Sequence, residues 1–106
     1  MNKNQALDLW LDEVGEQVYT YDFSGKKIKR DDYNVKNEVG WVVTYVKPIQ
    51  LGGNNNKGNI IIMHHRTADE KGNNFPEFEI GHKKYIAYYN QKEDFYYIEE
   101  CLEDED

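Results

Sequence analysis

The chain of 106 residues lacks several features that mark specialised classes of protein. It has one cysteine, Cys101, so no intrachain disulfide can form, and a reducing compartment suits that composition best. Its longest apolar run, Ile60–Met63, is far too short to cross a bilayer. The first fifteen residues are polar and acidic between their apolar positions, unlike a signal peptide. We therefore expect a cytoplasmic protein that does not enter a membrane.

Positive charge is also scarce. Thirteen lysines and arginines stand against twenty aspartates and glutamates, which gives a net charge of -7. Sequence-independent DNA binders usually carry a basic excess, so direct nucleic-acid binding is not expected. The acidic residues are densest at the end, at Glu99, Glu100, Glu103, Asp104, Glu105 and Asp106. This end is either a solvated tail or an acidic surface, which would repel nucleic acid or bind a basic protein in its place.

What the chain does contain is enough for one modest core. Hydrophobic residues make up 39% of it and aromatic residues 14%, as in soluble globular proteins. No internal repeat and no linker rich in proline or serine interrupts the sequence. We predict a single domain over residues 1–106 that ends in an acidic C-terminal tail at residues 99–106.

The apolar pattern predicts a helix followed by short strands. The expected helix lies within Ala6–Gln17 and closes near Gly15, and a hairpin follows at Val18–Phe23 and Lys26–Arg30. Further on we expect strands at Trp41–Val46 and Asn59–Met63, a short helix at His64–Lys71, and strands at Glu77–Ile80, Lys84–Tyr89 and Phe95–Glu99. The expected core contains Trp41, Val43, Val46, Ile60 and Ile62, with Trp10 and Leu7 over it.

The stretch Gly40–Gly72 resembles the HNH endonuclease family, whose core is a ββα-metal finger. The resemblance is carried by Gly40-Trp41, Pro48, Gly52-Gly53, Asn59-Ile60, His64 and Asp69-Glu70-Lys71, in this order. Similar flanking residues at Tyr21–Ile28 and Phe75–Phe78 extend it over most of the chain. It implies an α+β fold, in which the finger is flanked by an N-terminal helix and antiparallel β-hairpins.

The same resemblance implies which residues to test for catalysis. In the family a first-strand aspartate and a helix residue bind a divalent cation, while a histidine beside the aspartate is the general base. Here the aspartate position is Thr44, the base position is Tyr45 and the helix position is Ala68. A neutral hydroxyl is a weak ligand, a phenol is a poor base near neutral pH, and alanine has no ligand. Asn59, which supports the loop in the family, is retained, with His64 nearby. We therefore expect a degenerate site without catalytic residues, metal or cofactor.

Other candidate sites are weaker. Adjacent residues on a helix point in different directions, so His64 and His65, even with the distant His82, fit ordinary polar histidines better than metal ligands. The loop Gly53–Gly58 precedes Asn59-Ile60 instead of Lys-Ser or Lys-Thr, which excludes a Walker A phosphate loop. Cys101 lies among acidic residues, a setting that disfavours a reactive thiolate.

Tyrosine is unusually frequent near the C-terminus. Side chains alternate between the two faces of a strand, so neighbouring tyrosines of the predicted hairpin cannot all be buried on one face. Exposed tyrosine is common in protein interfaces because it offers a large contact area and a hydroxyl at low entropic cost. We predict a protein-binding surface that contains Tyr88, Tyr89, Tyr96, Tyr97, Glu99 and Glu100.

The leading hypothesis is a catalytically inactive HNH-like protein that binds another protein. The expected partner is a nucleic-acid-handling enzyme, and the expected role is inhibition, as by a phage or mobile-element anti-defence protein such as an anti-CRISPR. A second hypothesis is a divergent HNH DNA endonuclease whose metal site is rebuilt from His64, His65, Asp69 or Glu70. A third is a non-cleaving nucleic-acid-binding module that uses Lys26–Arg30.

Overall fold

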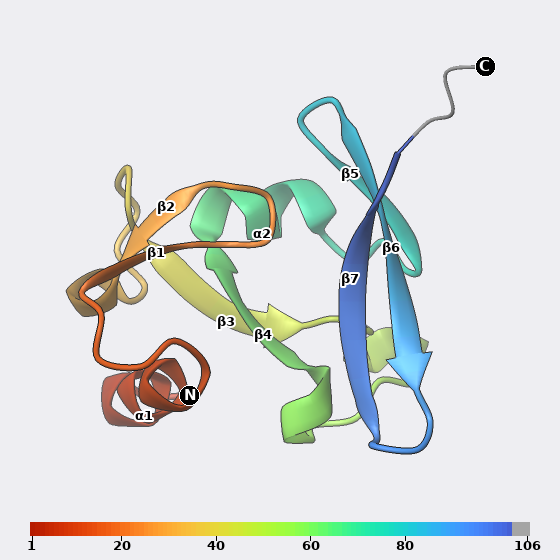
Figure 1. Cartoon of the computed structure of the whole chain (residues 1–106), viewed down its shortest axis with the longest axis horizontal. Coiled ribbons are helices and arrows are strands. Elements are labelled where there is room, and N and C mark those ends of the chain that lie inside the picture. The colour runs from red at the N-terminus through yellow and green to blue at the C-terminus, as the bar shows by residue number, and fades with distance from the viewer. Residues whose placement is uncertain (103–106) are drawn as a thin grey trace. The chain divides into compact units, whose positions relative to one another are not determined.

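The computed structural model describes residues 1–102, which contain two α-helices and seven β-strands (Figure 1). Glu103, Asp104, Glu105 and Asp106 of the predicted tail lie outside them. The elements are α1 (Lys3–Glu13), β1 (Tyr19–Tyr21), β2 (Lys27–Lys29), β3 (Trp41–Tyr45), β4 (Ile60–His64), α2 (His65–Lys71), β5 (Glu77–Ile80), β6 (Lys83–Asn90) and β7 (Phe95–Cys101). The class is mixed α+β, as predicted.

The strands form three sheets, β1-β2, β3-β4 and β5-β6-β7. Short 3₁₀ turns occupy Arg30–Asp32, Ile49–Leu51 and Lys57–Asn59. The chain divides into two compact units, which we call the first unit (Met1–Thr44 with Ile62–Asp69) and the second unit (Tyr45–Ile61 with Glu70–Asp106). Neither helix in the described part of the chain is long and apolar enough to cross a membrane.

Helix α1 starts earlier than its apolar pattern predicts. The Asn2 side chain accepts a hydrogen bond from the Gln5 N–H at 2.8 Å, and the Gln5 side chain accepts one from the Asn2 N–H at 3.0 Å. This capping box satisfies N–H groups that the first turn would leave free, so the helix begins at Lys3 and not at Ala6. The predicted closure near Gly15 is confirmed, because Gly15 adopts a left-handed φ of 98° just after the last turn.

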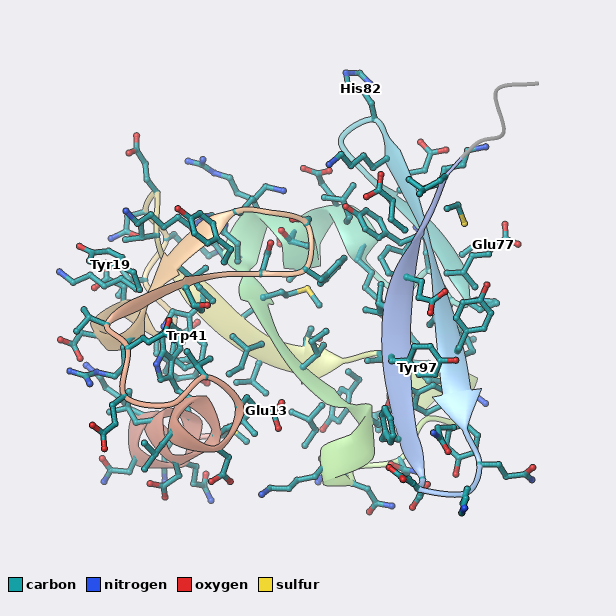
Figure 2. All side chains as sticks on the ribbon, viewed as in Figure 1. Glu13, Tyr19, Trp41, Glu77, His82 and Tyr97 are labelled. Carbon is teal, nitrogen blue, oxygen red and sulfur yellow. The ribbon has the colours of Figure 1, made fainter. Side chains whose placement is uncertain are left out.

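The core of the first unit is built around two tryptophans. Ala6, Trp10, Ile28 and Trp41 are fully buried, and the Trp10 and Trp41 ring centroids lie 5.0 Å apart (Figure 2 labels Trp41). Leu7, Val14, Tyr33, Val43 and Ile62 pack against this cluster. The Trp41 indole N–H donates to the Lys29 carbonyl at 2.8 Å. The buried Trp41 ring therefore also binds a backbone carbonyl at the end of β2.

The second unit contains the three-stranded antiparallel sheet. Its register pairs Phe78 with Tyr85 and Ala87 with Ile98. Phe78, Ile80, Tyr85 and Ala87 are buried and alternate with exposed residues, so one face of the sheet is covered. The β6–β7 turn closes because Asp94 takes a left-handed φ of 58° and donates its N–H to the Asn90 carbonyl at 2.8 Å.

The expected core positions are divided between the units. Trp10 and Trp41 are buried in the first unit, where Leu7, Val43 and Ile62 are half-buried. Val46 is buried in the second unit, and Ile60 is half-buried there.

The tryptophan pair yields a stability prediction. Trp41→Phe keeps an aromatic ring but shrinks it and leaves the Lys29 carbonyl without its indole donor. We expect a loss of about 2–3 kcal/mol in the free energy of unfolding, measured by urea denaturation. The control Leu11→Ala, at an exposed position of α1, should change it by less than about 0.5 kcal/mol. Equal effects of the two changes would contradict the central position of Trp41.

Candidate functional site

The three positions to which the family resemblance points, Thr44, Tyr45 and Ala68, carry no carboxylate or imidazole group. Thr44, near the end of β3, and Ala68, in the middle of α2, are half-buried in the first unit. Tyr45 is half-buried in the second unit, where its hydroxyl donates to the Asn55 side chain at 2.9 Å. Among residues 1–102 no three His, Cys, Asp or Glu side chains gather closely enough to hold a metal ion.

His64 is buried, and both of its ring nitrogens are engaged. Nδ1 accepts a hydrogen bond from the Arg66 N–H at 3.0 Å, so the ring proton lies on Nε2, which donates to the Glu38 carbonyl at 2.9 Å. The neighbouring His65 ring lies against it, with centroids 4.5 Å apart, and its Nε2 donates to the Asn37 carbonyl at 2.7 Å. A metal ligand needs a free ring nitrogen, and His64 offers none.

The other members of a rebuilt metal site are also placed unfavourably. His82 is exposed at the tip of the β5–β6 turn in the second unit (Figure 2). Glu70, in the same unit, uses one carboxylate oxygen to accept from the Gly81 N–H at 2.6 Å. Asp69 is exposed in the first unit. This geometry counts against a nuclease rebuilt from His64, His65, Asp69 or Glu70.

Asp22 is the most highly bonded carboxylate of the first unit, and the sequence patterns did not single it out. Its Oδ1 accepts from the Ser24 N–H, the Ser24 hydroxyl and the Lys26 N–H, at 2.7–3.0 Å. Its Oδ2 accepts from the His64 N–H at 3.0 Å and the Thr67 hydroxyl at 2.7 Å. Asp22 thus joins the β1–β2 turn to the end of β4 and the first turn of α2.

The sequence did hold a local signal for Asp22. An aspartate followed two residues later by Ser24 and then by Gly25 is typical of an Asx turn. Burial by itself raises the pKa of Asp22, but the hydrogen bonds from Thr67, Ser24, His64 and Lys26 favour the ionised form more strongly. The pKa of Asp22 is therefore lowered from its ordinary value.

Asn59, to which the family resemblance also pointed, organises the loop of the second unit. It is 1% exposed, accepts from the Lys47 N–H at 2.7 Å, and donates to the Lys47 and Asn54 carbonyls at 2.9 and 2.8 Å. Gly53 permits this closure, since an added Cβ would lie 1.9 Å from the Lys47 carbonyl oxygen. Of the glycines and asparagines in this loop, Gly52 adopts a left-handed φ, of 96°. Asn59 is thus a structural clamp.

Lys71, at the end of α2, is a buried cation that is held by backbone carbonyls. Its ammonium donates to the Val46 carbonyl at 2.9 Å and the Asn74 carbonyl at 3.2 Å, and it lies 5.2 Å from the centre of the Phe78 ring. Burial lowers the pKa of Lys71. Its bonds to backbone carbonyls give it a structural role in the second unit.

The sheet β5-β6-β7 has a second face, which we call the exposed face. It carries Glu77, Glu79, Lys84, Ile86, Tyr88, Phe95, Tyr97, Glu99 and Cys101. Its register places Glu77, Ile86 and Glu99 in one row across the strands, beside the pair Tyr88 and Tyr97 (Figure 2 labels Glu77 and Tyr97). These two tyrosine rings are stacked, with centroids 5.5 Å apart, and the Phe95 ring lies 6.0 Å from that of Tyr97.

This face combines exposed rings with unpaired negative charge. Tyr88 and Tyr97 are 41% and 40% exposed. None of Glu77, Glu79 and Glu99 forms an ion pair with any of residues 1–102. A hollow of about 620 Å³ lies beside Glu77 and Glu79, and residues of both sheet faces line it, among them Lys84 from the exposed face and Phe78 and Tyr85 from the other. The face is therefore an anionic surface with an aromatic stripe.

The register divides the six residues that we predicted as one binding surface. Tyr88, Tyr97 and Glu99 lie on the exposed face, whereas Tyr89, Tyr96 and Glu100 alternate onto the other side. The Tyr89 and Tyr96 rings lie 4.8 Å apart, and the Tyr89 hydroxyl donates to Asp94. That hydrogen bond raises the pKa of Tyr89 above its ordinary value. Glu77 and Glu79, absent from the predicted surface, join it because β5 pairs with β6.

Comparisons with protein-family models, with curated proteins and with solved structures found no match for this chain.

Replacing the Asp22 carboxylate should destabilise the protein in a pH-dependent way. In Asp22→Asn an NH₂ group replaces one oxygen and faces N–H or O–H donors, so we expect a loss of about 2–3 kcal/mol at pH 7. The folded pKa lies below the unfolded value of about 3.9, so the carboxylate stabilises the fold above that pH. This contribution disappears as the pH falls through the folded pKa, and the gap between the two proteins should close.

Urea denaturation between about pH 2 and pH 7 measures this difference. The control Asp8→Asn, at an exposed position of α1, should leave the stability near the wild-type value at every pH. A gap between wild type and Asp22→Asn that stays constant with pH would show that the charge of Asp22 does not stabilise the fold.

The Asn59 clamp predicts a different pH response. Asn59→Asp keeps the acceptor for the Lys47 N–H but turns a carboxylate oxygen toward the Lys47 and Asn54 carbonyls. We expect a loss of about 3 kcal/mol at pH 7, partly recovered in acid, where a protonated carboxyl group again donates one hydrogen bond. Thermal denaturation of the exposed control Asn56→Asp should show neither effect. A variant as stable as the wild type at pH 7 would contradict the clamp.

Proposed function

We propose that this chain is a catalytically inactive HNH-like protein that acts in the cytosol by binding a basic protein surface through its exposed face. The observation that carries the proposal is the combination of unpaired Glu77, Glu79 and Glu99 with the stacked Tyr88 and Tyr97 on one sheet face. The proposed role is inhibition of a nucleic-acid-handling enzyme, as by an anti-defence protein of a phage or mobile element, an anti-CRISPR among them.

The chemistry of the face supports a protein partner that normally binds nucleic acid. Enzymes that handle nucleic acid hold phosphates with lysine and arginine side chains. Carboxylates arranged on a rigid sheet can pair with the same cations, and the negative field speeds the encounter. The tyrosines add the apolar contact area that salt does not screen. The hollow beside Glu77 and Glu79 has room for a long basic side chain of such a partner.

The residues at the catalytic positions of the HNH family support the proposal that the protein is catalytically inactive. Hydrolysis of a phosphodiester by an HNH-like centre needs a cation beside the phosphate and a base on the attacking water. Thr44, Tyr45 and Ala68 supply neither at the family positions. His64, the retained neighbour, has its two nitrogens bonded to backbone groups. Asn59, which supports the loop, is retained without the rest of the set.

Binding to purified nucleases, measured by calorimetry and inhibition assays, tests the proposal with a matched pair of tyrosines. Tyr97→Ala on the exposed face should weaken binding about thirtyfold, as at an interface hot spot. Glu77→Gln with Glu99→Gln should mainly slow association and reduce its salt dependence. Tyr89→Ala, an exposed tyrosine on the other side of the same sheet, is the control and should bind normally.

Two results would overturn the proposal. If Tyr97→Ala and the glutamine variants inhibit their target as well as the wild type does, binding does not use the exposed face. If the protein nicks plasmid DNA with Mg²⁺, Mn²⁺, Ni²⁺ or Zn²⁺, and His64→Ala abolishes this, the chain is a divergent nuclease. We expect no cleavage with any of these ions.

A further inference from the structure

We propose that the outer face of the β1–β2 hairpin binds single-stranded nucleic acid. This inference is independent of the proposed protein partner, because it concerns only the first unit. The strand register pairs Tyr19 with Lys29 and Tyr21 with Lys27, while Thr20 pairs with the buried Ile28. Two tyrosines and two lysines therefore share the side of the hairpin that faces away from the core.

These four side chains lie close together, and all but the half-buried Lys29 are exposed. Tyr21 is 64% exposed and Tyr19 is 44% exposed. The Lys27 ammonium lies 4.5 Å from the centre of the Tyr19 ring, and that of Lys29 lies 5.8 Å from it (Figure 2 labels Tyr19). Both cations therefore lie over the Tyr19 ring, next to the more exposed Tyr21, and we call this group the Tyr–Lys platform (Tyr19, Tyr21, Lys27 and Lys29).

This combination matches the needs of a single strand. Proteins that bind single-stranded DNA or RNA stack unpaired bases on aromatic rings and pair the backbone phosphates with lysine or arginine. The Tyr21 ring is exposed and can take a stacked base, while Tyr19, two residues away on the same face, lies about 7 Å from it. Lys27 and Lys29, held over the Tyr19 ring, are placed to pair with the phosphates next to that base.

The platform is also held rigid before any ligand arrives. Asp22 bonds the Ser24 and Lys26 N–H groups inside the turn, and Ile28 anchors the second strand in the core. A rigid platform loses little conformational entropy on binding. The cations over its ring hold Tyr19 in place, whereas Tyr21, 64% exposed, is open to a ligand.

A duplex and an acidic protein fit the platform less well. A duplex hides the faces of its bases, so only the phosphates would be contacted, and the net charge of -7 opposes a purely ionic association. Arg30, the other nearby cation, already pairs with Asp31 at 3.4 Å. Short-range stacking on Tyr21 must therefore supply most of the affinity. Carboxylate side chains cannot stack in this way, whereas bases can.

Fluorescence anisotropy with labelled oligothymidylate, about 12 nucleotides long, tests the platform at low ionic strength. The wild type should bind saturably, and Tyr21→Ala should weaken binding about tenfold because one stacked base is lost. Lys27→Gln should reduce the dependence of log K on log salt by about 0.7, the value for one phosphate contact on a single strand. Tyr89→Ala, an exposed tyrosine of the second unit that lies outside both proposed surfaces, should bind as the wild type does.

Competition experiments separate stacking from charge. An abasic oligonucleotide of the same length, a duplex and polyglutamate should each compete at least tenfold more weakly than oligothymidylate. Equal competition by any of them overturns the proposal, and so does the absence of binding at low salt. Because Tyr21 is exposed, unchanged melting of Tyr21→Ala should show that a loss of binding is not a loss of folding.

Discussion

One buried carboxylate, that of Asp22, holds several elements of the first unit together. Asp22 is 7% exposed, and its five hydrogen bonds come from a turn, a strand end and a helix that are up to 45 residues apart in the sequence. A buried charge is costly unless donors surround it, so the hairpin, the end of β4 and the start of α2 must be in place together. The backbone N–H of His64 is one of those donors, while the His64 ring serves other bonds. The backbone and the ring of His64 therefore both make structural hydrogen bonds.

The two proposed surfaces share one type of scaffold and differ in the sign of their charge. Each combines tyrosine with charge on a short antiparallel sheet, but the signs are opposite: carboxylates around Tyr97 in the second unit, ammonium groups around Tyr19 in the first. Among the described residues, Asp22, Asn59 and Lys71 satisfy their buried polar groups with protein atoms. Recognition by a rigid sheet needs fixed side chains, and this packing provides them.

Local patterns predicted the elements better than the contacts between them. The strand at Glu77–Ile80 and the helix closure near Gly15 follow from alternation and from glycine, which act over a few residues. The start of α1 was placed three residues late, because the cap formed by Asn2 and Gln5 precedes the apolar run. The network of Asp22 and the membership of Glu77 in the exposed face depend on long-range pairing, which no periodicity contains. For the same reason the register, and not composition, separated Tyr88 and Tyr97 from Tyr89 and Tyr96.

The distribution of aromatic residues gives the protein two separate optical signals. Both tryptophans of the chain, Trp10 and Trp41, lie in contact in the first unit, and the second unit contains only phenylalanine and tyrosine among its aromatic side chains. Emission excited at the red edge of the absorption band, where tyrosine does not absorb, therefore arises from the first unit alone. The stacked Tyr88 and Tyr97 add a tyrosine contribution from the second unit to the near-ultraviolet circular dichroism. Without any label, tryptophan emission therefore follows the loss of order in the first unit by itself.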